Sequence, residues 1–342
     1  MPDKRPKGRP RHGLRLLCFL MIFALLFALV SGLMRSKLYS TTRALYEEPR
    51  NSVDVLFLGS SHMLNAVAPL QLWQEQGIAS VNYSQNGQVL PVSYYALQEA
   101  LRFQSPDLVV LDVYKAVQDS LIDSKASLHY TLDTMKPGLP KYRAILDLLP
   151  EGERGEYVID LIAYHTRWKE LSAADLDWEG DIAEKGAQAL FTTAPNPVMT
   201  VAPPEEKGAC AAVAIEYLEK IVQLCKAENV ELLLVAVPFG VPDNDELGRQ
   251  QAANAVADYA AQWGVPYLNL MHHTQEMGFS FQTDLADVYH VNWRGMEKVT
   301  AYLGGYLTGH YHLPDRRGDP AYAGWHTAAK EYEEYLAEHI PN

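Results

Sequence analysis

The chain has 342 residues, 48% of them hydrophobic, and a formal net charge of −13 at pH 7. Residues 1–35 hold seven Lys or Arg and one Asp, so the remainder carries −19 and offers no basic face for nucleic acid. The apolar content is sufficient for the core of one large α/β domain with an insertion.

The first predicted element is a membrane-spanning helix over residues 16–34. The run from Leu16 to Met34 is uncharged, and its nineteen residues approach the length needed to cross about 30 Å of hydrocarbon. Basic residues precede it at Lys4, Arg5, Lys7, Arg9, Arg11 and Arg15. This asymmetry predicts a single-pass protein of the cell membrane, with residues 1–15 as a cytoplasmic basic tail and the chain beyond about Lys37 outside.

A cleaved signal peptide is the alternative for the same segment. Small residues around Val30-Ser31-Gly32 offer a place for cleavage. The apolar core of a signal peptide is usually only about 7 to 15 residues long. The length of the run therefore favours an uncleaved anchor.

Apolar strands alternate with amphipathic helices from Val53 onward. The predicted strands are Val53–Leu58, Ser80–Tyr83, Leu108–Val113, Leu232–Pro238 and Pro266–Leu270. The predicted helices are Pro69–Gln76, Val92–Phe103, Ala209–Glu228, Glu246–Trp263 and Trp293–Leu307. This order predicts an α/β fold, a three-layer α/β/α arrangement with a mostly parallel five-stranded sheet.

The rhythm breaks between residues 115 and 205, which we interpret as an inserted helical cap or substrate subdomain. The catalytic domain is then predicted over 50–114 and 206–312. Residues 313–342 are predicted to form a linker followed by an amphipathic helix over 328–340.

Two short motifs carry the predicted chemistry. Gly59-Ser60-Ser61-His62 follows the first strand, and Asp287-x-x-His290 precedes the last main-domain helix. A serine hydroxyl becomes nucleophilic when a positioned imidazole accepts its proton, and a carboxylate fixes the tautomer of that imidazole. The motifs therefore predict Ser61 as nucleophile, His290 as base and Asp287 as the acid that orients it. Asp284, six residues before His290, is the second choice for the acid.

These motifs resemble those of the SGNH/GDSL hydrolase superfamily, in which a serine block follows the first strand and an Asp-x-x-His block precedes the last helix. Leu58–His62, Val81–Ser84 and Asp287–Gly295 are most similar to membrane-anchored members, such as the D-alanine transfer protein of teichoic acid modification and the alginate O-acetylation proteins. The resemblance covers about residues 50–115 and 230–310.

The resemblance implies an extracytoplasmic enzyme that moves acyl groups on cell-wall or exopolysaccharide sugars. It also implies a membrane-bound O-acyltransferase as partner, and a glycan or an acylated small molecule as substrate. An esterase and an O-acyltransferase would use the same triad. The alternative is a catalytically weak surface protein that binds glycan or scaffolds an acyltransferase.

The chain departs from the superfamily at its serine motif and at its oxyanion hole. Ser60 stands where the superfamily usually has Asp, Ser84 where it has Gly, and Asp112 follows the third strand in place of Gly-x-Asn-Asp. Backbone N–H groups of Ser61 and Ser84 remain candidate donors, and Asn86 is the candidate for the missing side-chain donor. Loss of one such donor typically lowers the rate by about 10² to 10³. These departures support the scaffold alternative.

Three other residues are candidate substrate contacts. His62 adjoins the nucleophile, although a histidine at a helix start is more often exposed. Tyr164 and Trp168 lie in an aromatic cluster that would either stack on a sugar or pack the insertion onto the main domain. His272 and His273 have no third ligand at suitable spacing, so the sequence predicts neither a metal nor another cofactor.

Overall fold

The computed structural model describes residues 10–35, 40–176, 184–194, 201–241 and 244–341. Contacts divide the chain into two compact units. Unit 1 comprises residues 1–37 and 150–179, and unit 2 comprises residues 38–149 and 180–342.

Unit 2 is built on a parallel five-stranded sheet. Its strands are β1 (Val55–Leu58), β2 (Ser80–Asn82), β3 (Leu108–Asp112), β4 (Glu231–Ala236) and β5 (Tyr267–Asn269). They lie in the order β2-β1-β3-β4-β5, and every neighbouring pair is parallel. Val55 in β1 is in register with Ser80 on one side and Leu108 on the other. The predicted α/β fold with five parallel strands is confirmed.

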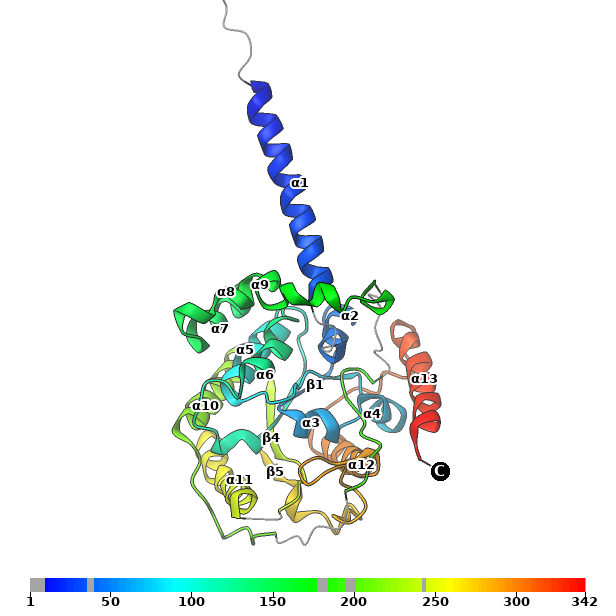
Figure 1. Cartoon of the computed structure of the whole chain (residues 1–342). Helices are drawn as coiled ribbons and strands as arrows, with labels where there is room; N and C mark the ends of the chain where they lie inside the picture. Colours follow the sequence, from blue (N-terminus) through cyan, green and yellow to red (C-terminus); the bar gives the residue numbers. More distant parts are fainter. Residues whose placement is uncertain (1–9, 36–39, 177–183, 195–200, 242–243, 342) are drawn as a thin grey trace, which may run out of the picture. The chain divides into compact units, whose positions relative to one another are not determined.

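Helices cover both faces of this sheet (Figure 1). The helices of six or more residues in unit 2 are α3 (Ser61–Ala66), α4 (Pro69–Gln76), α5 (Leu90–Ala100), α6 (Lys125–Leu132), α7 (Leu139–Leu148), α10 (Ala212–Glu228), α11 (Asn244–Trp263), α12 (Trp293–His310) and α13 (Ala323–His339). Helix α5 packs with α7 and α10, whereas α12 packs with α3 and α4. The result is the predicted three-layer α/β/α arrangement.

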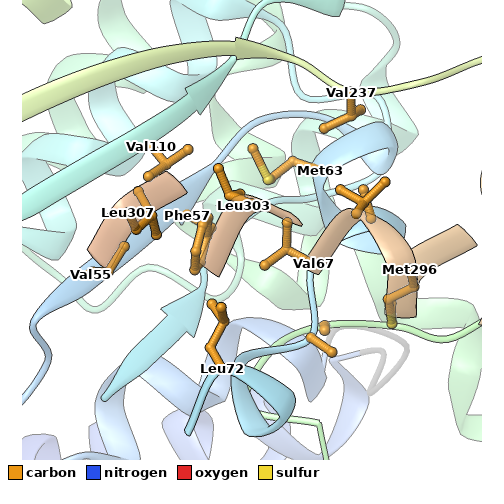
Figure 2. Packing of buried hydrophobic residues seen from close by; sticks show 14 of the residues in the cluster. Val55, Phe57, Met63, Val67, Leu72, Val110, Val237, Met296, Leu303 and Leu307 are labelled. Atoms are coloured by element: carbon orange, nitrogen blue, oxygen red, sulfur yellow. The ribbon is translucent and has the colours of Figure 1, made fainter. Parts of the chain in front are cut away.

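Side chains that alternate along the strands form the core between the sheet and α12. Val55 and Phe57 of β1 belong to one hydrophobic cluster with Leu303 and Leu307 of α12 (Figure 2). Leu56 between them is equally buried, because successive side chains in a strand point to opposite faces and both faces here are covered. Burial on both faces explains why the strands are apolar throughout.

Within unit 2, polar contacts join the C-terminal segment to residues near the start of the unit. Arg316 donates to Asp54 at 2.7 Å, and the indole of Trp325 donates to Glu48 at 3.1 Å. Helix α13 begins at Ala323, five residues before the predicted start at 328, because the preceding turn over Pro320–Tyr322 is capped by Asp319 and continues into it. The segment thus covers α4, with which α13 packs.

Unit 1 combines α1 (Pro10–Met34) with short helices from later in the chain. These are η3 (Glu151–Glu153), α8 (Gly155–Val158), α9 (Asp160–Tyr164), η4 (His165–Lys169) and η5 (Ala173–Leu176). Within the described ranges, only α1 is both long enough and apolar enough to cross a membrane; the candidate span is His12–Met34. A signal sequence would satisfy the same criteria.

The residues predicted as one insertion fall in both units. Residues 115–149 and 180–205 are in unit 2, whereas 150–179 are in unit 1. Parts of the interval lie outside the described residues, at 177–183 and 195–200. The boundaries predicted for the insertion remain a prediction.

Candidate active site

The nucleophile candidate lies where β1 gives way to α3. Ser60 is the N-cap of α3, and its hydroxyl accepts from the N–H of His62 at 3.4 Å. Ser61 is therefore the first helical residue, at the carboxyl end of a central strand. In open parallel sheets this is the edge at which ligands bind.

Gly59 allows strand β3 to approach this turn closely. A β-carbon at Gly59 would lie 2.8 Å from that of Asp112 and 3.0 Å from that of Met63. Contacts this short do not occur between real β-carbons, so a larger residue would push β1 and β3 apart. Glycine is thus required in front of the two serines for a packing reason.

Ser61, His290 and Asp287 are joined in series. The Ser61 Oγ lies 2.8 Å from His290 Nε2. On the other side of the ring, His290 Nδ1 lies 2.9 Å from Asp287 Oδ2 and 3.0 Å from Oδ1. The structure brings together the three residues that the sequence motifs single out, in the order that a nucleophile, base and orienting acid require.

A short loop holds the acid and the base. Leu285 and Val291 form an antiparallel bridge at its ends, and the N–H of Ala286 donates to the carbonyl of His290 at 2.8 Å. Asn292, fully buried, caps α12 and donates to the carbonyl of Leu285 at 3.2 Å. The position of His290 is thereby fixed by backbone and cap contacts.

Asp287 is kept ionised by its surroundings. Partial burial acts to raise its pKa, but hydrogen bonds from the His290 ring and from the N–H groups of Tyr289 and His290 outweigh burial and lower the pKa below its ordinary value. An ionised carboxylate selects the His290 tautomer that carries its proton on Nδ1 and leaves Nε2 free to accept from Ser61.

The predicted oxyanion donors lie after β2. Ser84 is fully buried, and its N–H donates to the Asn82 side chain at 3.3 Å. Asn86 lies in the following turn and is half-buried. The N–H of Gln85 donates to the carbonyl of Gly59 at 3.2 Å, which ties this turn to the serine turn. Assignment of Ser61, Ser84 and Asn86 as oxyanion donors remains a proposal.

Asp112 is the last residue of β3, at the start of the stretch that replaces the Gly-x-Asn-Asp motif in the sequence. Its Oδ2 accepts from the N–H of Tyr114 at 3.3 Å, whereas Oδ1 is buried without a hydrogen-bond partner. Burial raises the pKa of this carboxyl to about 7, against weaker lowering by backbone N–H groups. A carboxyl group with an open lone pair thus lies beside the serine turn.

His62 is buried, so the expectation that a helix-start histidine is exposed is wrong here. Its ring stacks on that of Tyr114, with the ring centroids 3.3 Å apart, and lies edge-on to the ring of Phe239, with the centroids 5.7 Å apart. The centroid of the His290 ring is 5.1 Å away. Burial, followed by the nearby His290, lowers the pKa of His62 well below its ordinary value. A neutral His62 ring therefore lies beside the His290 ring. Sequence reasoning missed Tyr114, the first residue of the 3₁₀ helix η2 (Tyr114–Val117), and Phe239, which lies in the loop after β4; the two share no motif.

Asp284, the second choice for the acid, has a different role. It is fully buried, accepts from the N–H of Ser280 at 2.7 Å and pairs with Lys298 at 2.7 Å. These contacts fix the loop before Asp287.

The other candidates are occupied elsewhere or lie in unit 1. His272 lies 2.8 Å from Asn254, and His273 lies 2.6 Å from Glu276. Among the residues that the structure describes, no group of three side chains suited to a metal was found. Tyr164 and Trp168 belong to unit 1, and their predicted role in binding substrate stays a prediction.

A serine, a histidine and an aspartate joined in series beside a parallel sheet are the arrangement that serine hydrolases use. No family model matches the sequence, and no curated protein matches it. Solved structures with a similar chain trace are known.

Three of them are 12% identical to this chain. One, from Bacteroides fragilis, is provisionally described as an acylhydrolase; it has a TM-score of 0.41, with 80% of this chain and 96% of its own covered. The second, from Desulfitobacterium hafniense, is provisionally described as a lipolytic protein of the G-D-S-L family, with a TM-score of 0.40 and coverages of 74% and 98%. The third, from Streptococcus pneumoniae, is provisionally described as a platelet activating factor, with a TM-score of 0.41 and coverages of 86% and 99%.

At this identity the likeness concerns the arrangement of the chain and carries no argument about activity. The G-D-S-L family named for the second structure is the one that the sequence motifs resemble. None of the three descriptions mentions a membrane-anchored branch.

Proposed function

We propose that the chain is an extracytoplasmic serine acyl-transfer enzyme, an esterase or O-acyltransferase acting on acyl groups of cell-wall or exopolysaccharide sugars. One observation carries the catalytic part: the Ser61 Oγ lies 2.8 Å from His290 Nε2, while His290 Nδ1 lies 2.9 Å from Asp287. A serine that merely capped a helix would need neither partner.

In the first half-reaction Ser61 Oγ forms a bond to the carbonyl carbon of an acyl donor. Its proton passes to His290 Nε2, and Asp287 stabilises the imidazolium. When the carbon–oxygen bond to the leaving group breaks, His290 returns the proton to the departing oxygen. An acyl-Ser61 ester remains, and the histidine is neutral again.

In the second half-reaction an incoming hydroxyl releases the acyl group. His290 Nε2 accepts the proton of that hydroxyl as its oxygen bonds to the acyl carbon, and then returns a proton to Ser61. Water gives hydrolysis, and a sugar hydroxyl gives O-acylation. The side chain of Asp287 is about half exposed and that of His290 about a quarter, so an acceptor can reach the base from solvent.

Helix α1 supports the proposed location. Its length and composition support a membrane anchor, and the basic residues before it support a cytoplasmic N-terminus. An anchored enzyme outside the membrane would act on envelope glycans, with a membrane-bound O-acyltransferase as partner and supplier of acyl groups.

The second candidate function is a scaffold or glycan-binding protein with little catalysis. It is favoured by Ser84 in place of the oxyanion-hole glycine and by the missing Gly-x-Asn-Asp motif after β3. An active serine distinguishes the two candidates.

A fluorophosphonate probe tests this on the full chain in detergent micelles. We expect the parent to be labelled, and Ser61→Ala and His290→Ala to lose labelling. Ser60→Ala is the matched control, because it removes the neighbouring hydroxyl and should keep labelling. If the folded parent stays unlabelled, or if Ser61→Ala is labelled equally, the proposal of a serine enzyme is rejected and the scaffold or glycan-binding function is favoured.

Hydrolysis and transfer are then separated with a p-nitrophenyl acyl ester. Release of p-nitrophenol reports acylation of Ser61, and acylated sugar is measured by mass spectrometry after addition of a glycan oligomer. Acylated sugar that disappears in Ser61→Ala identifies a transferase. Free acid alone identifies an esterase.

A further inference from the structure

Unit 1 exposes large apolar side chains on its short helices as well as on α1. Val158 is 52% exposed, Ile162 is 51% exposed and Trp168 is 61% exposed, and Ile159 joins them at 38%. We call these four residues the α9 face. In a water-soluble surface, isolated apolar side chains are ordinary, but four exposed ones within eleven residues are a concentration that suggests a partner.

The α9 face is attached to the end of α1. Arg35, one residue after α1, donates through Nε to Asp160 at 3.0 Å. Arg167 donates to the carbonyls of Met34 at 2.8 Å and of Arg35 at 2.6 Å. These bonds satisfy carbonyls that a helix end leaves without a partner. The segment carrying the α9 face therefore sits at the level where the apolar run of α1 ends.

The side chains that flank Val158 and Ile159 in the sequence point inward. Tyr157 is fully buried and Asp160 nearly so, whereas Val158 and Ile159 between them are exposed. Arg167 is held further by Asp175, whose Oδ1 it approaches at 2.6 Å. The segment is thus folded in a defined way, with its polar anchors turned toward α1 and its apolar side chains turned out.

The net charge of the segment argues against electrostatic attraction to anionic lipid. Residues 150–169 contain four acidic and three basic residues, so the segment is close to neutral. The attraction of basic clusters to anionic lipid requires an excess of Lys and Arg, which is absent here. Trp168, with the Lys169 ammonium 5.6 Å from its ring, is instead a residue pair typical of the membrane–water interface.

We propose that the α9 face lies in the headgroup and upper acyl region of the same bilayer leaflet from which α1 emerges. The proposal rests on α1 being a membrane anchor. The occupant is lipid, because the face begins at the depth where α1 leaves the hydrocarbon, is apolar and has almost no net charge. Short amphipathic segments of this kind lie in the interface plane with the apolar side buried.

The test uses the full chain reconstituted in phosphatidylcholine vesicles. Single cysteines, with the remaining native ones among Cys18, Cys210 and Cys225 changed to Ala, carry an environment-sensitive fluorophore. Lipids labelled with a doxyl group near the headgroup end of the acyl chain quench it on contact. The positions compared are Ile162→Cys, native Cys18 in α1, and Lys330→Cys, whose side chain is exposed on α13.

We expect quenching at Ile162→Cys at least about threefold greater than at Lys330→Cys, because only the former is buried in lipid. Quenching at Cys18 shows whether α1 spans. If Cys18 is quenched and Ile162→Cys is not, the α9 face does not contact lipid and this inference fails while the anchor stands. If neither is quenched, the anchor itself fails.

A second variant ties the effect to the apolar face. With the fluorophore at Val158→Cys, Ile162→Asp should reduce quenching at least about twofold, because a charge in the interface is costly. Thr166→Asp, an equal charge at an exposed polar position of the same segment, should leave it unchanged. Equal loss in both variants would point to disruption of the segment and overturn the assignment of the α9 face.

Addition of a soluble glycan oligomer tests the competing role of Trp168 in sugar binding. A change in Trp fluorescence on addition of glycan that disappears in Trp168→Phe, together with no quenching by lipid at Ile162→Cys, would contradict the lipid assignment. Replacement of part of the phosphatidylcholine by phosphatidylglycerol should change quenching less than about twofold, because the segment has almost no net charge.

Discussion

The apolar side chains of the two units face different surroundings. In unit 2, Val55, Phe57 and their neighbours on the strands are buried between the sheet and its helices. In unit 1, α1 and the α9 face expose residues of the same chemical kind. Apolar surface is stable where water is excluded. The core of unit 2 meets this condition within the chain, although α7 of the same unit exposes Leu139 and Leu146, whereas α1 and the α9 face would meet it only against a partner. Catalysis and attachment should therefore be separable by mutation.

The largest effect is expected at the orienting acid. Asp287→Asn should lower kcat/KM for a small soluble ester by about 10⁴-fold, because the amide no longer selects the productive His290 tautomer. Ile162→Asp should leave this activity unchanged, because the α9 face belongs to the unit that lacks the site. Steady-state hydrolysis by the full chain in detergent measures both. Equal loss in the two variants would show that the units are not separable.

A matched pair of isoleucines compares burial in the two units. Ile221 of α10 is fully buried, whereas Ile162 of α9 is half exposed. Ile221→Ala should lower the free energy of unfolding by about 2–5 kcal/mol, and Ile162→Ala by less than about 0.5 kcal/mol. Guanidinium unfolding in micelles measures this. A cost at Ile162 as large as at Ile221 would place Ile162 in a protein core.

The interior of unit 2 also penalises charge. Because burial raises the pKa of Asp112 to about 7, the folded state keeps a proton that the unfolded chain loses above its ordinary pKa near 4. Stability should therefore fall as the pH rises from about 4 to 7, by at most about 1.4 kcal/mol per pH unit.

Asp112→Asn should flatten this slope, because the amide does not titrate. Thermal unfolding as a function of pH measures it. A slope that persists in the variant would assign the titration to another group.

Asp175 in unit 1 should show the opposite sign, and the smallest effect. The N–H of Ser172 and the Arg167 side chain hold its pKa below the ordinary value. Its contribution is present above the ordinary pKa and is lost as the pH falls through the lowered one. The protection factor of the Ser172 amide against hydrogen exchange should fall on acidification in the parent, and Asp175→Asn should remove that dependence.

Elements with local signals could be predicted from the sequence. Helix α4 has the predicted bounds Pro69–Gln76, because Pro69 begins it and Gly77, at φ +72°, ends it. Strand β1 begins two residues later than predicted. Val53 is apolar and buried, but Asp54 turns its carboxylate to Arg316, 262 residues away. The residues next to Asp54 in the sequence do not predict its ion pair with Arg316.

The candidate site divides in the same way. Ser61, His290 and Asp287 belong to short motifs, and the structure places them in contact as the motifs predict. The surroundings of His62 depend on Tyr114 and Phe239, which meet it only in the folded chain. The aromatic cluster around Trp168 suggested a sugar contact. Its neighbour Arg167 binds the end of α1, a relation that sequence spacing does not encode.

Ser61 and His290 are separated by 229 positions, and this has a consequence for biosynthesis. Because a chain is synthesised from its N-terminus, the turn that contains Ser61 leaves the ribosome long before His290 does. Until α12 follows and the loop between Leu285 and Val291 closes, the hydroxyl has no proton acceptor. A nascent chain that stops short of residue 290 therefore lacks the Ser61–His290 contact on which the proposed reactivity depends.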